Sequence, residues 1–231
     1  QHGFYAGNVN MFVAFSSAFS NNGQRGLHAT GIVTAAITNT TFIGNAQHAA
    51  YLSFNNGQFV ANDGNTGSGN GLGVILLNGT LSGTITLAPN ANLPYSFDQL
   101  TVNSGASLVL QAGVVVKPAF STRGSIFGQV SLQVNGSLQA LGTPDNPVVI
   151  TSLKDDSYGG DSNNDGSATS PAGSDWGYIQ INSGGSANFT HTIVRYGGYY
   201  YRYIGRYAYT DYANLYLAGG TLTLDDSTVS N

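Results

Sequence analysis

The sequence predicts an all-β protein in the form of a parallel β-helix, a solenoid of short strands with inserted loops. Three observations support this fold class. Only 8% of the 231 residues are charged, and all eleven acidic residues are aspartates, whereas about a quarter of an ordinary globular domain is charged. The chain has 32 glycines and many Asn, Ser and Thr residues, which favour turns and pleated surfaces over helices. A pattern of alternating apolar residues around a small polar turn also recurs.

The recurring pattern predicts the strands of successive rungs. Its copies are Val74–Leu81, Leu100–Leu110, Leu132–Leu138, Ile179–Gly185 and Leu215–Leu224, and the runs Ile37–Asn45 and Ala50–Gly57 fit it as well. The turn glycines are unevenly spaced, which indicates one coil with loops of different length. A sandwich or an array of hairpins remains the alternative, because Asn-Gly between strands also favours a hairpin. Coils are preferred because like copies let each rung bury the same apolar positions.

A single domain is expected over residues 1–231, because no linker divides the chain. Within residues 1–30, the apolar run Met11–Phe15 and Phe19 would suit an N-terminal cap or a segment exchanged with a neighbouring copy. Residues 154–176 and 196–212 interrupt the alternation. They are expected to be two loops inserted into the coil.

Charge and residue composition also limit which partners and which cellular location the protein can have. The net charge of −4 gives no basic field for nucleic acid, and no interval is apolar enough to insert into a membrane. The chain has few charges, no cysteine, and Gln1 rather than Met at its start. We therefore expect an extracellular or cell-surface protein whose signal peptide has been removed.

One part of the chain resembles a known family. The residues that carry the resemblance are Val134–Pro144, Asn146–Ser152 and Gly173–Gly177, the aspartates between them, and the later runs Ile193–Gly198 and Leu224–Asn231. They are similar to a module of bacterial secreted β-helix proteins with pectin-lyase-like folds, often described as adhesins. The resemblance covers roughly residues 70 to 231 and implies a right-handed coil. It implies no single activity, since such folds host lyases, hydrolases and structural shafts.

The acidic loop predicts a calcium site. Asp161, Asn163, Asp165 and the Ser167 carbonyl match the first half of an oxygen-ligand calcium loop, in which Gly166 permits the bend. The twelfth loop position is Ala172 rather than glutamate, so this is not an EF-hand. Three further aspartates are candidates to complete the shell: Asp175, Asp155 and Asp156. The alternative is a solvated polar loop with Asx turns.

Catalysis is a second interpretation of the same loop. A calcium-dependent polysaccharide lyase would need a base to abstract a proton, and a glycosidase would need two carboxylates across a sugar bond. Lys154 and Arg195 are the nearest candidate bases in the sequence. Nothing in the sequence places either one opposite the acidic loop, so no catalytic residues are assigned.

The second inserted loop is rich in tyrosine and arginine, which suits recognition because tyrosine gives a large contact area and arginine stacks on its ring. The candidate partner-binding residues are Tyr199, Tyr200, Tyr201, Arg202, Tyr203, Arg206, Tyr207 and Tyr209. Their partner would be a cell-surface glycan or another copy of the chain. Equally, the tyrosines could fold back on their own coil.

The four histidines have no paired spacing typical of zinc and are expected to be ordinary surface or packed residues.

Together, these observations predict a non-enzymatic, structural or adhesive β-helix with a structural calcium loop. An open coil has unpaired strand edges at both ends, so we expect head-to-tail association into a fibre or membership of a longer shaft. The alternatives are a glycan-binding module and, less favoured, the calcium-dependent enzyme.

Overall fold

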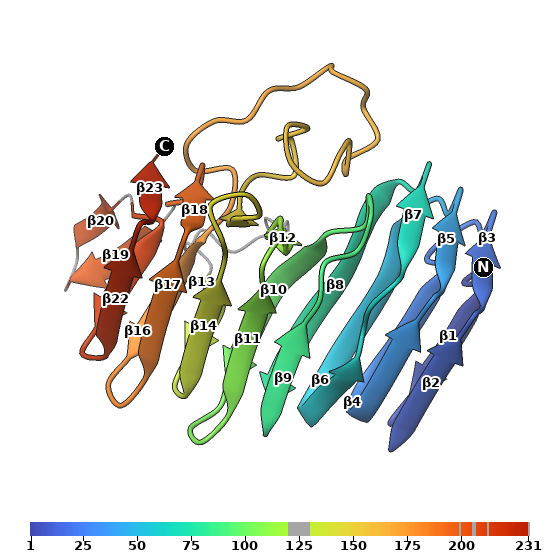
Figure 1. Cartoon of the computed structure of the whole chain (residues 1–231), viewed down its shortest axis with the longest axis horizontal. Coiled ribbons are helices and arrows are strands. Elements are labelled where there is room, and N and C mark those ends of the chain that lie inside the picture. The colour runs from blue at the N-terminus through green and yellow to red at the C-terminus, as the bar shows by residue number, and fades with distance from the viewer. Residues whose placement is uncertain (120–129, 199, 205–206, 212, 231) are drawn as a thin grey trace.

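The chain is an all-β coil (Figure 1). A computed structural model describes residues 1–119, 130–198, 200–204, 207–211 and 213–230, without the side chains of 130 and 200–211. The rungs follow one another along the long axis, from the N-terminal strands at one end to the C-terminal strands at the other (Figure 1). Within the described residues, no helix is long and apolar enough to cross a membrane. The predicted parallel β-helix with inserted loops is confirmed.

The largest sheet has thirteen strands, and all of its pairs are parallel. Its main path runs through β1 (Phe4–Gly7), β4 (Leu27–Thr38), β6 (His48–Ala61), β8 (Leu72–Leu81), β10 (Tyr95–Val102), β12 (Val115–Val116), β15 (Val148–Ile150), β18 (Thr192–Arg195) and β23 (Thr228–Ser230). Four strands pair beside this path: β2 (Met11–Phe15), β13 (Val130–Val134), β16 (Tyr178–Asn182) and β21 (Leu215–Ala218).

Two smaller parallel sheets complete the coil, and one hairpin projects from it. The five-stranded sheet contains β9 (Thr84–Leu87), β11 (Ser107–Gln111), β14 (Ser137–Leu141), β17 (Ser186–Thr190) and β22 (Thr221–Asp225). The three-stranded sheet contains β3 (Ala18–Ser20), β5 (Thr41–Ile43) and β7 (Thr66–Ser68). The hairpin pairs β19 (Tyr200–Ile204) with β20 (Tyr207–Asp211) in antiparallel fashion.

Strand register places equivalent residues of successive rungs in columns that face the interior. One column runs through Phe4, Leu27, Ala50, Ile75, Tyr95, Val116, Ile150, Val194 and Val229. The seven inner members are fully buried, whereas the two end members are each 40% exposed. Each rung therefore covers the apolar positions of the next, as the repeated sequence pattern predicts. The N-terminal runs form rungs as well, since β1 and β2 pair with β4.

Glycine is required at the turns for two reasons, backbone conformation and the close approach of neighbouring turns. Gly79 and Gly105 have a positive φ, which glycine adopts readily, but Gly136 and Gly185 do not. A Cβ on Gly136 would lie 2.2 Å from the Ala106 carbonyl oxygen, and one on Gly185 would lie 2.3 Å from that of Val134. The turns of neighbouring coils lie too close together for a side chain at Gly136 or Gly185, because a Cβ there would clash with a backbone carbonyl.

Ladders of buried asparagines fill the bends of the N-terminal half. The Asn22 Nδ2 donates to Asn45 Oδ1 at 2.7 Å, and Asn45 Nδ2 donates to Asn70 Oδ1 at 2.7 Å. These residues are 23 and 25 positions apart, which is one coil. Asn45 Nδ2 also donates to the Phe19 carbonyl, and Asn70 Nδ2 to that of Phe42. The ladder joins three coils and satisfies polar groups that the bends bury.

Replacing a central ladder residue should destabilise the coil. We expect Asn45→Ala to lower the free energy of unfolding by about 1–3 kcal/mol, because it removes the side-chain hydrogen bonds of Asn45 to Asn22, Asn70 and the Phe19 carbonyl in the neighbouring coils. Chemical denaturation would measure the change. The control is Asn188→Ala, at an exposed position of β17, which should change the free energy by no more than about 0.5 kcal/mol. Equal effects of the two substitutions would contradict a structural role for the ladder.

Candidate functional site

The acidic loop, residues 154–176, leaves the coil after β15 and rejoins it at β16. It extends beside the strands and returns toward the start of β8 (Figure 1). The amide of Gly73, in β8, donates to the Ser162 carbonyl at 2.8 Å. The Lys117 ammonium donates to the Gly160 carbonyl at 2.7 Å. The loop is therefore fastened to several rungs, although most of residues 164–173 are exposed.

A buried ion pair holds the beginning of the loop. The Arg195 guanidinium of β18 donates to Asp155 Oδ2 at 2.6 Å through Nη2 and at 3.0 Å through Nε. Ser157 and Thr151 also donate to this carboxylate. Burial would raise the pKa of Asp155, but the hydrogen bonds from Ser157, Thr151 and Arg195 outweigh it and lower the pKa below its ordinary value. Asp155 is a structural anchor rather than an available ligand.

A second ion pair and a tryptophan hold the end of the loop. The Lys154 Nζ lies 2.6 Å from Asp175 Oδ1, and Asp175 Oδ2 accepts hydrogen bonds from the Ser152 hydroxyl and the Ala172 amide. Trp176 is fully buried, and its Nε1 donates to the Arg195 carbonyl at 2.9 Å. Both basic residues considered for catalysis are thus bound to loop carboxylates, which sequence spacing alone did not reveal.

Lys117 is a fully buried lysine beneath the loop. Burial lowers its pKa to about 8, against the opposing influence of Asp155, Asp156 and Asp161. A buried ammonium needs negative charge nearby. Some of the aspartates in the loop therefore serve to balance the charge of Lys117, a residue that the sequence analysis did not single out.

The middle of the loop forms the compact turn expected of the calcium motif. Asp161 accepts hydrogen bonds from the amides of Asp165 and Gly166, at 3.2 and 2.9 Å. Asn163 Nδ2 donates to Asp165 Oδ2 at 2.8 Å. Among the described residues, Asn163 Oδ1 and Asp165 Oδ1 are buried without a hydrogen-bond partner. Two oxygens of the motif thus lack the partners that buried polar atoms normally have.

The other predicted ligands are distributed differently. Asp155 and Asp175 are bound to Arg195 and Lys154, while Asp156 and Ser167 are exposed. In the described part of the chain, no three Asp or His side chains gather as a metal-binding group. A cation at this turn would therefore depend on amide and carbonyl oxygens in addition to Asp161 and Asp165.

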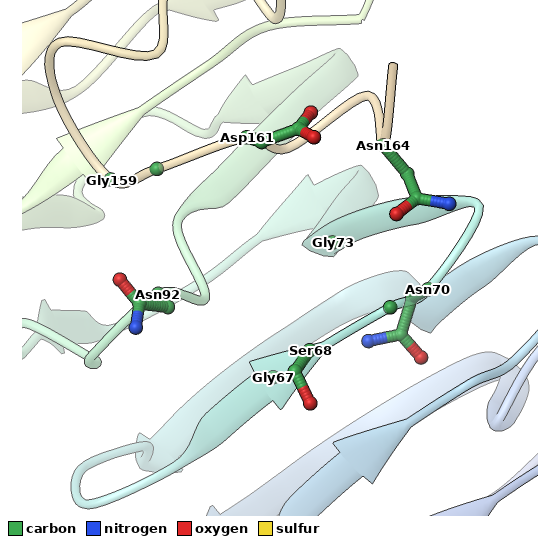
Figure 2. A pocket seen from close by; sticks show the side chains of 10 residues that line it. Gly67, Ser68, Asn70, Gly73, Asn92, Gly159, Asp161 and Asn164 are labelled. Atoms are coloured by element: carbon green, nitrogen blue, oxygen red, sulfur yellow. The ribbon is translucent and has the colours of Figure 1, made fainter. Parts of the chain in front are cut away.

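A small hollow of about 260 Å³ lies where the loop crosses the turn before β8. Figure 2 shows Gly159, Asp161 and Asn164 of the loop on one side and Gly67, Ser68 and Asn70 on the other. Its walls are mostly glycines and amides. The Asn70 amide is already used by the ladder, and the Asp161 carboxylate accepts hydrogen bonds from its own turn.

The structure also gathers three histidines that looked scattered in the sequence. His2, His28 and His48 surround Arg25, which contacts the His28 ring at 3.1 Å and donates through Nε to His48 Nδ1 at 3.5 Å. The Arg25 guanidinium also lies 4.4 Å from the centre of the Tyr51 ring. These three histidines are packed residues, and they meet because His2, Arg25 and His48 follow one another at intervals of 23 residues, about one coil length.

This Arg25 cluster keeps its histidines neutral. Burial, Arg25 and His2 together lower the pKa of His28 to about 4. Burial, Arg25 and His28 lower that of His48 to about 4. Neutral rings have a nitrogen that accepts a hydrogen bond from the guanidinium. The histidines therefore orient Arg25 without cancelling its charge.

A groove of about 590 Å³ connects the Arg25 cluster to the acidic loop. Arg25, His48 and Tyr51 line one part of it, and Lys154 and Asp175 line another. Between them, β8 and β10 contribute side chains, including Leu76, Asn78, Asp98 and Gln99. The groove combines charged, amide and aromatic groups.

The Tyr/Arg-rich insertion contains a hairpin, since β19 and β20 pair from Tyr200–Asp211 to Ile204–Tyr207. Tyr199 and Arg206 lie outside the described residues. So do the side chains of the other predicted contacts, Tyr200, Tyr201, Arg202, Tyr203, Tyr207 and Tyr209. Partner or glycan binding by this hairpin stays a prediction.

The Arg25 cluster should make stability depend on pH between about 6.5 and 4. In this window unfolded histidines take up protons near pH 6.5, whereas folded His28 and His48 stay neutral until about 4. The unfolded state then binds more protons, so stability falls as pH falls. We expect the melting temperature to drop across this window, by about 2–4 °C for each kcal/mol lost.

Circular dichroism melts at several pH values would measure this drop. The double variant His28→Gln, His48→Gln should show a shallower dependence between pH 6.5 and 4, whatever its absolute stability. An unchanged slope would contradict the contribution of these two rings.

Comparison with known proteins adds no functional assignment. No family model, curated protein or solved structure matches this chain. The coil, the fastened acidic loop and the groove between them are therefore interpreted from their own chemistry.

Proposed function

We propose that this protein is an extracellular structural or adhesive β-helix whose copies associate head to tail into a fibre, or that it forms part of a longer surface shaft. The observation that carries the proposal is the apolar surface of the C-terminal rung. Leu217, Leu224 and Val229 are 49%, 46% and 40% exposed. Their register partners one rung inward are Ile181, Phe189 and Val194, which are all fully buried.

These three residues are the ends of interior columns rather than ordinary surface side chains. In the described residues, β21, β22 and β23 each pair on one side only. An unpaired parallel edge with apolar positions readily accepts another strand. A further rung stacked on this edge would bury all three side chains and pair the free backbone groups.

The N-terminal rung is a suitable occupant, because it offers a matching edge. Among the described strands, β1 pairs only with β4. Its Phe4 is 40% exposed and belongs to the column that ends at Val229. Stacking the N-terminal rung of one copy on the C-terminal rung of another would continue this column. The exposed side chains of Met11, Val13 and Phe15 add apolar surface beside the same edge.

An extracellular setting is supported by composition and by the resemblance to secreted bacterial β-helix proteins. Only 8% of the residues are charged, and the chain has no cysteine, so an oxidising extracellular environment would not form disulfides in it. A structural role is favoured over lyase chemistry, because Lys154 and Arg195 are both bound in ion pairs with loop aspartates. Their amine and guanidinium thus serve to hold the loop.

The proposal includes a structural calcium ion at the turn of residues 161–167. Asp161 and Asp165 would supply carboxylate oxygens, and Asn163 and the Ser167 carbonyl would supply neutral ones. The support is the pair of buried, unpartnered oxygens on Asn163 and Asp165. The ion would stiffen the loop without taking part in any reaction.

Self-association is tested by electron microscopy of negatively stained protein across a concentration series, together with light scattering. We expect filaments that grow with concentration. The double variant Leu217→Lys, Leu224→Lys should stay monomeric, because it places two charges in the stacking surface. The control is Val60→Lys, at a residue that is also exposed but lies mid-coil. Wild-type protein that is monomeric throughout, or filaments in the double variant, would refute head-to-tail stacking.

Calcium binding is tested by the melting temperature with and without a chelator. Bound calcium should raise the melting temperature, since a ligand that binds only the folded state stabilises it, by about 2.7 kcal/mol at a hundred times its dissociation constant. Asp161→Ala should abolish the increase, and Asp145→Ala, at an exposed turn, should retain it. A melting temperature that calcium does not change would refute the calcium site and identify the turn as a polar loop held by its own hydrogen bonds.

A further inference from the structure

A strand that is apolar on both sides lies at the N-terminal end of the coil. In β2, Phe12 and Ala14 point inward and are buried. Met11, Val13 and Phe15 point outward, and each is more than half exposed. A strand with one face in water alternates apolar and polar residues, whereas a continuous apolar run is typical of strands covered on both faces. The outer side of β2 thus has the sequence of a covered surface.

The same apolar surface continues onto the neighbouring strands. β2 pairs with the second half of β4, which pairs in turn with β6 (Figure 1). Val33 and Val60 lie where the register between β4 and β6 shifts, and they are 45% and 55% exposed. In β9, by contrast, the exposed positions are threonines. The apolar face, as we call it, therefore belongs to the first rungs and consists of Met11, Val13, Phe15, Val33 and Val60.

Head-to-tail stacking leaves the apolar face open. A further rung would pair with β2 edge to edge, and side chains of paired strands project above and below the sheet rather than across its edge. Val33 and Val60 lie in β4 and β6, each of which already has a paired strand on both sides. The apolar face is therefore a surface separate from the stacking edge.

The absence of charge on this face favours a second copy of the chain as its occupant. Among residues 1–62, Arg25 is the only Asp, Glu, Lys or Arg, and it precedes the half of β4 that pairs with β1 rather than β2. When two identical surfaces meet about a two-fold axis, like groups come close together, so a charged surface would repel itself. A lipid surface is less favoured, because membrane-binding faces carry Lys or Arg for anionic headgroups.

The size of the apolar face determines when two copies would associate through it. Its side chains, about half to two-thirds exposed, present roughly 500 Å², whereas a stable interface takes about 800 Å² from each partner. An isolated pair of copies would therefore be weak. In a fibre whose columns continue from copy to copy, the face recurs along one side, and many weak contacts act together.

We propose that the apolar face joins two head-to-tail fibres side by side, with the face of each copy packed on the same face of a copy in the other fibre. The inference rests on the proposed fibre, because pairing without stacking buries too little surface. The contact is of the sheet-on-sheet kind, in which side chains of two sheets about 10 Å apart interdigitate.

Electron microscopy of the full chain tests the pairing, with negative stain for filament shape and scanning transmission for mass per length. The double variant Val33→Lys, Val60→Lys should form single filaments, because it sets like charges opposite one another across the contact and leaves the stacking edges unchanged. Wild-type filaments should be paired, with twice the mass per length of those of the variant. Circular dichroism confirms that each variant folds.

The matched control is Thr86→Lys, Gln111→Lys, which adds the same two charges at exposed positions of β9 and β11 outside the apolar face. Its filaments should stay paired. Wild-type protein without filaments would refute the fibre and the pairing together. Equal mass per length in wild type and Val33→Lys, Val60→Lys, or loss of pairing in the control, would refute the pairing and leave the fibre standing.

Flotation with phosphatidylcholine vesicles separates the second copy from a lipid surface. Paired wild-type filaments should not float with the vesicles. Single wild-type filaments that float, when those of Val33→Lys, Val60→Lys do not, would assign the apolar face to lipid and overturn the proposal.

Discussion

In-register stacking of parallel rungs is the constraint on which the rest of this protein depends. Each interior column, such as the one from Phe4 to Val229, is buried only because the next rung lies over it. The asparagine ladder and the close approach of the turn glycines both arise from the same one-coil repeat. A coil of this kind gains stability from contacts between neighbouring rungs. Its loops can therefore vary in length without disturbing the core.

Polar chemistry follows the same repeat on the outside of the coil. His2, Arg25 and His48 meet because they lie about one coil apart, as do Tyr5, His28 and Tyr51. The acidic loop is anchored on side chains from different rungs, including Lys117 and Arg195. The groove forms between these two arrangements. A scaffold that is uniform inside can thus present dissimilar groups side by side on its surface.

The sequence predicted the fold well and the site only in part. Alternation around turns that contain glycine located the strands near Leu100, Leu132, Ile179 and Leu215, because the interior selects apolar residues at fixed positions. It also located the acidic loop, and the compact turn at Asp161 formed as its spacing indicated. The ion-pair partners of Asp155 and Asp175 could not be predicted, since the first pair joins the loop to another rung and the second depends on how the loop folds back on its own start.

The Arg25 cluster was missed for a related reason. Its members come from separate coils, and only a search at intervals near 23 residues would have joined Arg25 to His48. Buried Lys117 gave no sequence signal either, because a single lysine after a strand usually points to solvent.

The Asp155–Arg195 pair has a consequence for the order in which the chain folds. The two residues are 40 positions apart, and Arg195 belongs to the strand that follows β15 in the sheet. Until β18 has docked, the Asp155 carboxylate lacks the guanidinium that holds the beginning of the loop. The Asp155–Arg195 ion pair therefore forms only after the following coil has folded. The pair spans 40 residues of chain, so it is a non-local contact of the kind that slows folding.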